Sequence, residues 1–149
     1  MDLAGLVAET AGSAAIFLDL KNGGAAVGSL VADAVRANPA VRIAASAQRW
    51  STLRSLDAAT RGIGLYYSID VRPQLNLFLS LIARDHRPRG VSCRHTLLTE
   101  SMVHEMHGHQ LEVIAWTVDE PERAEELASW GIDGITTNRV GDIVARLRP

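Results

Sequence analysis

Residues 111–138, LEVIAWTVDEPERAEELASWGIDGITTN, contain one strand–helix–strand unit. The apolar, β-branched runs at 111–117 and 132–136 each predict a short strand. Between them, Asp119-Glu120-Pro121-Glu122 is typical of a helix beginning, with a capping carboxylate, a proline for the first turn and negative charge near the helix N-terminus. The helix is expected to end at Trp130-Gly131. A strand, a helix and a second strand in this order are typical of a parallel sheet.

The same pattern repeats through the rest of the chain. Further apolar runs that predict strands lie at 15–20, 41–45, 63–67 and 90–94. The segments between them have helical periodicity, as in one set of apolar residues expected to share a helix face: Val27, Leu30, Val31, Ala34 and Val35. Parallel strands need connections of about a dozen residues or more. The sequence therefore predicts an α/β fold, with six parallel strands and covering helices.

Composition narrows the class of protein. The chain has 149 residues, 47% of them apolar and 21% charged, which indicates one folded domain spanning 1–149. A net charge of −2 and 5% aromatic residues predict neither a nucleic-acid nor an anionic-membrane partner. No apolar stretch approaches the ~20 residues of a transmembrane segment, and the single Cys93 cannot form an internal disulfide. We expect a cytoplasmic protein, unless the true start lies upstream of Met1.

The number of predicted strands leaves the closure of the sheet open. A complete (β/α)₈ barrel has eight strands and typically ~250 residues, whereas six strands are predicted here. Neither a Gly-x-Gly-x-x-Gly nor a Gly-Lys-Ser/Thr motif occurs, so the usual nucleotide-binding signals are absent. The residues alone are compatible with an open doubly wound sheet and with an incomplete barrel.

Three segments resemble one enzyme family. The Trp116-Thr117-Val118 strand end, its acidic-proline helix entry and the Gly131–Thr137 run resemble the closing section of glycerophosphodiester phosphodiesterases. Ile16–Lys21 is similar to the mid-barrel strand of that family that ends in Glu-x-Lys, with Asp19 in place of the glutamate. Val91–His95 fits between them in the same order. The resemblance implies a truncated TIM-type (β/α) barrel with about six parallel strands.

The resemblance also implies a reaction and a set of residues. The family cleaves small-molecule glycerophosphodiesters to glycerol phosphate and an alcohol, with a divalent cation, Mg²⁺ or Ca²⁺, neutralising phosphoryl charge. Matching residues assigns Asp19 as a metal ligand, Lys21 as the catalytic cation that faces the phosphate, and Trp116 as a wall of the substrate pocket. His95, at the end of its predicted strand, is a further candidate for binding substrate.

Asp19 and Lys21 are two residues apart on a predicted strand, so their side chains share one face. In a barrel this face is the interior, and a buried acid and base are costly unless they pair or meet a ligand. A strand-end ion pair is the alternative to a role in phosphate and metal binding. Trp116 is likewise either a core residue or a pocket wall.

Several motifs that the family uses are missing. The chain contains no His-Arg-Gly, no Glu-x-Asp and no His-Asp, which supply the acid/base pair and two metal carboxylates in the family. We therefore expect hydrolysis by this chain alone to be impaired or absent. The alternative function is a non-catalytic remnant that binds a phosphate ligand or a protein partner, including a second copy of itself, through the exposed strand edges of an open barrel.

Other polar residues have simpler interpretations. His104, His107 and His109 suggest a zinc site, but no acidic or cysteine ligand completes the set, and imidazoles at a helix C-terminus need no metal. A nucleophilic pair of Cys93 and His95 is disfavoured. Asp133 is expected to fix the tight loop that leads into the last strand.

Overall fold

Helices and parallel strands alternate along the whole described chain. The computed structural model describes residues 2–10, 15–21, 25–60, 62–82 and 88–148, which form two compact units divided after residue 68. The strands are β1 (Ile16–Leu20), β2 (Ile43–Ala47), β3 (Gly64–Ile69), β4 (Gly90–Arg94), β5 (Glu112–Trp116) and β6 (Gly134–Ile135). The α helices are α1 (Leu3–Thr10), α2 (Ala25–Ala37), α3 (Trp50–Ala59), α4 (Arg72–Ile82), α5 (Glu100–Gly108), α6 (Pro121–Ser129) and α7 (Val140–Leu147).

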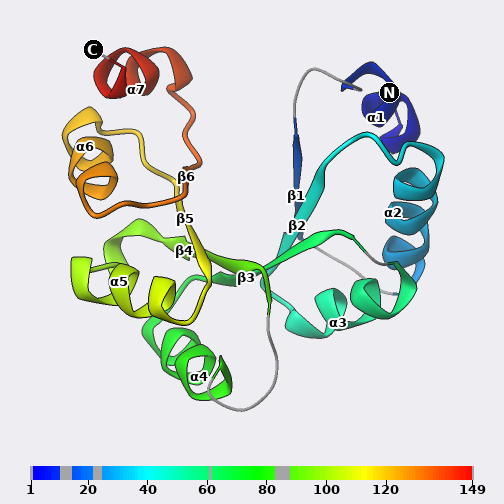
Figure 1. The fold of residues 1–149 in the computed structure, drawn as a ribbon, viewed down its shortest axis with the longest axis horizontal. Helices are drawn as coiled ribbons and strands as arrows, with labels where there is room; N and C mark the ends of the chain where they lie inside the picture. The colour runs from blue at the N-terminus through cyan, green and yellow to red at the C-terminus, as the bar shows by residue number, and fades with distance from the viewer. Residues whose placement is uncertain (1, 11–14, 22–24, 61, 83–87, 149) are drawn as a thin grey trace. The chain divides into compact units, whose positions relative to one another are not determined.

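In the first unit, β1, β2 and β3 are neighbouring parallel strands. Helices α1 and α2 lie on one side of β1 and β2 (Figure 1). A core of buried apolar residues joins α1, β1, α2 and β2: Val7, Ile16, Ala34, Val41 and Ile43. Helix α2 also packs on α3, and a Cβ at Gly28 would lie in ordinary van der Waals contact, 3.7 Å, with the carbonyl oxygen of Ser55.

Two local predictions for the first unit are wrong. Leu30 is 63% exposed, although the periodicity placed it on the buried face of its helix. The buried residues of α2 are Gly28, Val31, Ala32 and Ala34, so Val31 and Ala34 of the predicted face are buried whereas Leu30 is not. The strand predicted at 41–45 is also displaced: β2 extends from Ile43 to Ala47, and α3 begins at Trp50.

In the second unit, β4, β5 and β6 are neighbouring parallel strands. Side chains alternate along them: Val91, Cys93, Val113 and Ala115 are fully buried. The opposite face of β4 and β5 carries less buried side chains at the carboxyl ends of the strands, such as Arg94 opposite Trp116. Strand alternation thus separates a packed face from a face with polar and aromatic groups.

The helix boundaries of the second unit agree well with the sequence. Thr99 caps α5, because its side chain accepts a hydrogen bond from the Met102 amide. Helix α6 ends before Gly131, whose φ of +80° is the left-handed conformation that favours glycine. The α/β fold class with parallel strands and covering helices is confirmed.

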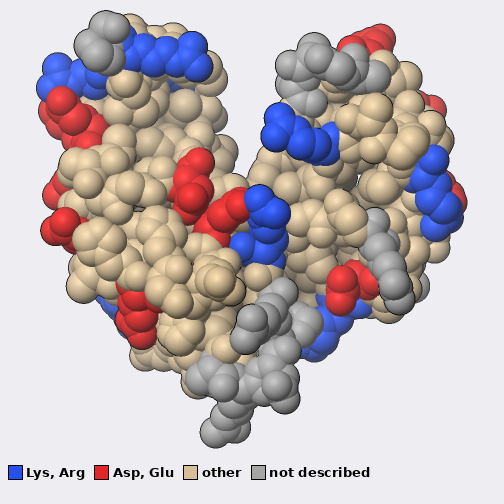
Figure 2. Space-filling view, in the orientation of Figure 1, with Lys and Arg blue, Asp and Glu red and all other residues tan. Residues whose placement is uncertain are grey.

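The surface shows no dominant charge on the face in view. Lysine and arginine side chains alternate there with aspartate and glutamate, and most of that surface is uncharged (Figure 2). Within the described ranges, none of the helices has the length and apolar character needed to cross a membrane.

Candidate functional site

In the first unit, the predicted pair of Asp19 and Lys21 forms an ion pair at the carboxyl end of β1. Lys21 Nζ lies 2.5 Å from Asp19 Oδ2, and the two side chains are 73% and 48% exposed. The expectation that both are buried is therefore wrong for the described chain. An ion pair this exposed contributes only about 0–1 kcal/mol to stability. Lys21 is consequently accessible to an anionic ligand.

The strand register adds a third polar group beside this pair. Ser46 of β2 lies opposite Asp19, and its hydroxyl donates a long hydrogen bond of 3.4 Å to Asp19 Oδ1. Tyr66 of β3 is opposite Ser46 and packs against Phe17, with ring centroids 5.2 Å apart. Because parallel neighbours in register share a face, Phe17, Asp19, Ser46 and Tyr66 form one surface of the sheet. Its polar end is the end that carries Lys21.

The described residues do not by themselves fit a Mg²⁺ or Ca²⁺ site. Both ions prefer several oxygen ligands, whereas Asp19 is the one carboxylate on this face and its partners are an ammonium group and a hydroxyl. Nowhere in the described part of the chain do three or more histidine, cysteine, aspartate or glutamate side chains gather in a way that could hold a metal ion. A role for Asp19 as a metal ligand therefore stays a prediction.

In the second unit, Trp116 lies at the carboxyl end of β5 and is half-buried. The Arg94 guanidinium, from the opposing position on β4, lies 5.8 Å from the centre of the Trp116 ring. Arg94 is also paired with the carboxylate of Asp70, which follows β3. The indole Nε1 of Trp116 is buried and has no hydrogen-bond partner among the described residues. Trp116 therefore combines a ring face covered by a cation with a buried N–H group that has no partner among the described residues.

His95 does not lie on β4. The strand ends at Arg94, and His95 begins a short 3₁₀ turn, His95–Leu97. Burial lowers the pKa of His95 below the ordinary value of histidine, and repulsion from the positive charge of Arg123 lowers it further. Its Nδ1 is buried and lacks a partner within the described part of the chain. A neutral imidazole at this position can exchange a hydrogen bond with a ligand but supplies no positive charge for a phosphate.

Arg123 of α6 fixes the turn that contains His95. Its Nη2 donates hydrogen bonds to the carbonyl oxygens of His95, at 2.6 Å, and Leu98, at 3.4 Å. The same guanidinium lies 4.7 Å from the centre of the Trp130 ring. A charged donor shared between two carbonyls orients the segment that follows β4. The position of His95 thus depends on a residue far along the chain.

Asp119 has a different role from the helix cap expected of it. The N-cap of α6 is Glu120, which makes no side-chain capping bond. The Asp119 carboxylate instead accepts hydrogen bonds from Thr137 Oγ1 at 3.0 Å, the Asn138 amide at 2.8 Å and Asn138 Nδ2 at 3.0 Å. The bonds from Asn138 are the main cause that lowers the Asp119 pKa. Asp119 therefore ties the segment after β6 to the segment after β5.

Asp133 fixes the loop before β6, as the sequence predicts. Its Oδ2 accepts hydrogen bonds from the Val113 amide at 2.7 Å and from His107 Nε2 at 2.9 Å. His107 is thereby held by a carboxylate, while His104 and His109 are exposed.

Cys93 is a poor candidate for a nucleophile. Its side chain is completely buried, and burial raises the pKa of its thiol to about 12. A thiol in this state is protonated at neutral pH and is unreactive. The nucleophilic pair with His95 that the sequence disfavoured has no support in this environment.

The sequence and fold both match one family. The sequence model of the Glycerophosphoryl diester phosphodiesterase family covers residues 19–142, so the chain belongs to this family. No protein of curated function matches the sequence.

Solved structures share the fold at low sequence identity. A structure from Silicibacter pomeroyi, assigned to the glycerophosphoryl diester phosphodiesterases, matches with a TM-score of 0.79 and 22% identity, over 97% of this chain and 55% of its own. A glycerophosphodiester phosphodiesterase from Parabacteroides distasonis matches with a TM-score of 0.77 and 17% identity, over 97% of this chain and 63% of its own. An Oleispira antarctica phosphodiesterase in complex with the product sn-glycerol-3-phosphate matches with a TM-score of 0.71 and 13% identity, over 84% of this chain and 50% of its own. The chain thus spans about half to two thirds of the length of these structures.

Sequence reasoning missed Arg94 and Asp70. Arg94 directly precedes His95, the residue of this segment that was predicted to bind substrate. Strand alternation was the available signal, because Arg94 is the last strand residue and lies two positions from Ser92 on the same face. Its pairing with Asp70 had no signal in the sequence.

Proposed function

We propose that the chain acts as part of a glycerophosphodiester phosphodiesterase, in which Lys21 binds the phosphoryl group of a glycerophosphodiester. The observation that carries this proposal is the position of Lys21 at the carboxyl end of β1, exposed and oriented by Asp19, in a chain that belongs to the family. Active sites of barrel enzymes lie at this end of the strands. An ammonium group there neutralises phosphoryl charge.

The second unit carries two groups that suit a ligand with hydroxyl groups. Trp116 offers an aromatic surface at the carboxyl end of β5, and His95 offers an unpartnered ring nitrogen close to the end of β4. Both groups suit the contact and hydrogen bonding of an alcohol portion rather than proton transfer. We assign them to substrate binding.

Hydrolysis by the 149 residues alone is expected to be weak or absent. Phosphodiester cleavage needs a base for the nucleophile and an acid for the leaving oxygen, and a divalent cation would supply charge neutralisation at the phosphoryl oxygens. The motifs that provide these groups in the family are absent from the sequence. Binding of the phosphate-containing ligand is therefore the property that the chain's own residues support.

Two measurements on the purified chain test this proposal. We expect sn-glycerol 3-phosphate to bind in isothermal titration calorimetry and Lys21→Ala to weaken binding by about tenfold, as for loss of one charge-assisted contact. Arg36→Ala is the matched control, because Arg36 is an exposed cation of the same unit that pairs with Asp33 on α2. Equal loss in both variants, or no binding by the native chain, would refute the assignment.

Hydrolysis of glycerophosphocholine with Mg²⁺ or Ca²⁺ is measured on the same samples. We expect little turnover. Substantial turnover that disappears in Lys21→Ala would mean that the chain assembles an acid/base pair of its own, and His95 would be the first residue to replace.

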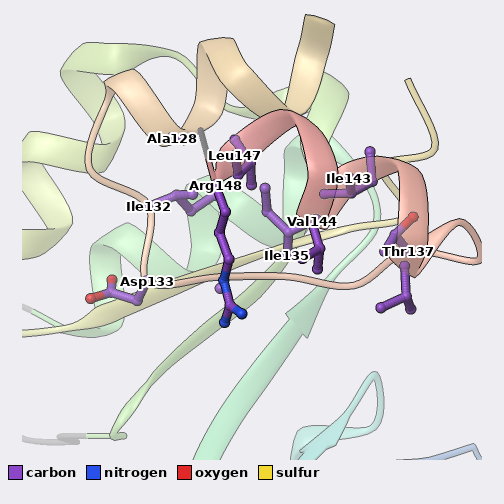
Figure 3. Close-up of a pocket in the computed structure, with 11 residues that line it drawn as sticks. Ala128, Ile132, Asp133, Ile135, Thr137, Ile143, Val144, Leu147 and Arg148 are labelled. Atoms are coloured by element: carbon purple, nitrogen blue, oxygen red, sulfur yellow. The ribbon is translucent and has the colours of Figure 1, made fainter. Parts of the chain in front are cut away.

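A second candidate function, association without catalysis, is favoured by an apolar pocket in the second unit. The pocket, of about 420 Å³, lies between β6, α6 and α7 and is lined by residues such as Ile132, Ile135 and Val144. Figure 3 shows Val144 of α7 near Ile135 of β6, with the Arg148 side chain extending past them. Val140 and Val144 are 61% and 40% exposed. Exposed apolar groups beside a strand of two residues favour contact with a second copy.

Sedimentation velocity distinguishes this candidate. We expect concentration-dependent dimers in the native chain that are lost in Val140→Ser/Val144→Ser, whereas Val71→Ser, an exposed valine elsewhere in the unit, leaves them unchanged. A monomer at all concentrations would reject the candidate.

A further inference from the structure

The carboxyl ends of β4 and β5 carry a cation held between an aromatic ring and a carboxylate. Arg94 lies 5.8 Å from the Trp116 ring centre and is ion-paired with Asp70. Its side chain is 49% exposed and that of Asp70 is 31% exposed, so the group is open to a ligand on one side. The Asp70 backbone amide donates to Gln74 Oε1 at 2.8 Å, which orders the segment that bears the carboxylate.

An aromatic face beside a carboxylate is a receptor for an organic cation. Quaternary and primary ammonium groups bind over tryptophan rings through the ring quadrupole, and a nearby carboxylate adds charge attraction. In this chain Arg94 already occupies that place, and its own positive charge repels a second cation. Cationic alcohols such as choline and ethanolamine are therefore disfavoured at Trp116.

The same cluster has groups that suit hydroxyls. Arg94 is a planar donor, Asp70 an acceptor and the unpartnered Trp116 Nε1–H a further donor. His95 adds a buried ring nitrogen without a described partner in the turn that follows β4. Buried polar atoms without partners are costly unless a ligand or water satisfies them. A polyhydroxy alcohol can supply several such hydrogen bonds, whereas a trimethylammonium group can supply none.

We infer that Arg94, held by Asp70 and Trp116, makes this end of the second unit selective for a neutral polyhydroxy alcohol, such as glycerol or inositol, over a cationic alcohol. This inference rests on the proposed function, because glycerophosphodiesters differ from one another in whether their alcohol is a neutral polyhydroxy group or a cation. Arg94 is a specificity-determining residue in this scheme and takes no part in proton transfer.

The experiment compares two diesters in calorimetric titrations of the purified chain: glycerophosphoinositol and glycerophosphocholine. We expect the native chain to bind the inositol diester more tightly. Arg94→Ala frees the Trp116 face and the Asp70 carboxylate, and the affinity ratio should shift toward the choline diester by about tenfold, the order of one cation–π contact supported by a charge. Arg94→Gln, which retains part of the side chain, should shift the ratio in the same direction.

The double variant Arg94→Ala/Asp70→Asn separates the carboxylate from the ring. We expect it to lose most of the gained choline affinity, because the remaining tryptophan acts without a charge partner. Arg89→Ala is the matched control, since Arg89 precedes β4 at its opposite end and pairs with Glu112. It should leave the ratio unchanged. In ¹H–¹⁵N spectra, the indole N–H signal of Trp116 is assigned as the one that is absent from Trp116→Phe. In the native chain, this signal should shift when the inositol diester is added.

Failure of the inference and failure of the proposed function give different results. If sn-glycerol 3-phosphate binds but Arg94→Ala and Arg94→Gln leave the diester ratio unchanged, the inference is overturned and the proposed function stands. If sn-glycerol 3-phosphate does not bind to the native chain, the proposed function fails and the inference with it. If Arg89→Ala and Arg94→Ala shift the ratio of the affinities for the two diesters equally, the inference is also overturned.

Discussion

Replacing Arg123 with alanine tests how the segment after β4 is held. Arg123 donates to the carbonyl oxygens of His95 and Leu98, and its side chain is only 20% exposed. Its guanidinium also lies 4.7 Å from the centre of the Trp130 ring. Arg123 thus joins α6 to the turn that contains His95.

The contacts give the magnitude of the effect. A hydrogen bond from a charged group contributes about 1.5–3 kcal/mol, and a cation–π contact near the surface adds about 0.5–1 kcal/mol. The 3.4 Å bond to Leu98 is long and adds little. We expect Arg123→Ala to lower the free energy of unfolding by about 2–4 kcal/mol. Arg123→Lys should lose less, because it retains the charge without the planar set of donors.

Urea unfolding followed by circular dichroism measures this change. Arg139→Ala is the control, because Arg139 pairs with Asp142 on the exposed surface of the same unit and such pairs contribute about 0–1 kcal/mol. NMR titration of His95 supplies an independent readout: loss of the Arg123 charge removes one cause that lowers the His95 pKa, so that pKa should rise. An Arg123→Ala variant as stable as Arg139→Ala, with an unchanged His95 pKa, would refute the reasoning.

Two further predictions concern Asp119 and Cys93. Because hydrogen bonds lower the Asp119 pKa in the folded chain, its stabilising effect is present above the ordinary pKa of an aspartate and is lost as the pH falls through the lowered value. Urea unfolding between pH 7 and pH 3 should therefore show that the stability difference between the native chain and Asp119→Asn narrows in acid, and a constant difference would contradict this. Cys93, with a buried thiol of pKa about 12, should resist a disulfide reagent such as dithiobis(nitrobenzoate) at pH 8 and react once in urea. Fast reaction of the folded chain would disprove its burial.

Much of the fold could be predicted because it depends on local patterns. Apolar runs of about five residues and the helical segments between them are set by neighbouring residues in the chain. Helix α6 begins at Pro121, within the predicted acidic-proline entry, and ends at Ser129, next to the predicted end at Trp130-Gly131. Leu30 was misplaced because its exposure depends on α2 packing against α3, which periodicity within one helix does not contain.

The candidate site was predicted only in part. Asp19 and Lys21 were predicted as neighbours on one strand; they do pair, but β1 ends at Leu20, so Lys21 directly follows the strand. The exposure of the pair depends on what the rest of the first unit covers, which is a property of packing. The residues next to Asp119 predict a helix cap, whereas its actual partners Thr137 and Asn138 come from a later segment of the chain.

The sequence by itself determined the alternation of strands and helices, the neighbouring positions of Asp19 and Lys21 at the end of the first strand, and the family to which the chain belongs. Only the tertiary structure decided that Arg94 lies between Asp70 and Trp116, and that Arg123 holds the turn containing His95. The physical reason is the distance along the chain over which each kind of interaction acts. Helix and strand periodicity act over a few residues, whereas strand register and helix packing bring together charged groups that are far apart in the chain and set which of them pair.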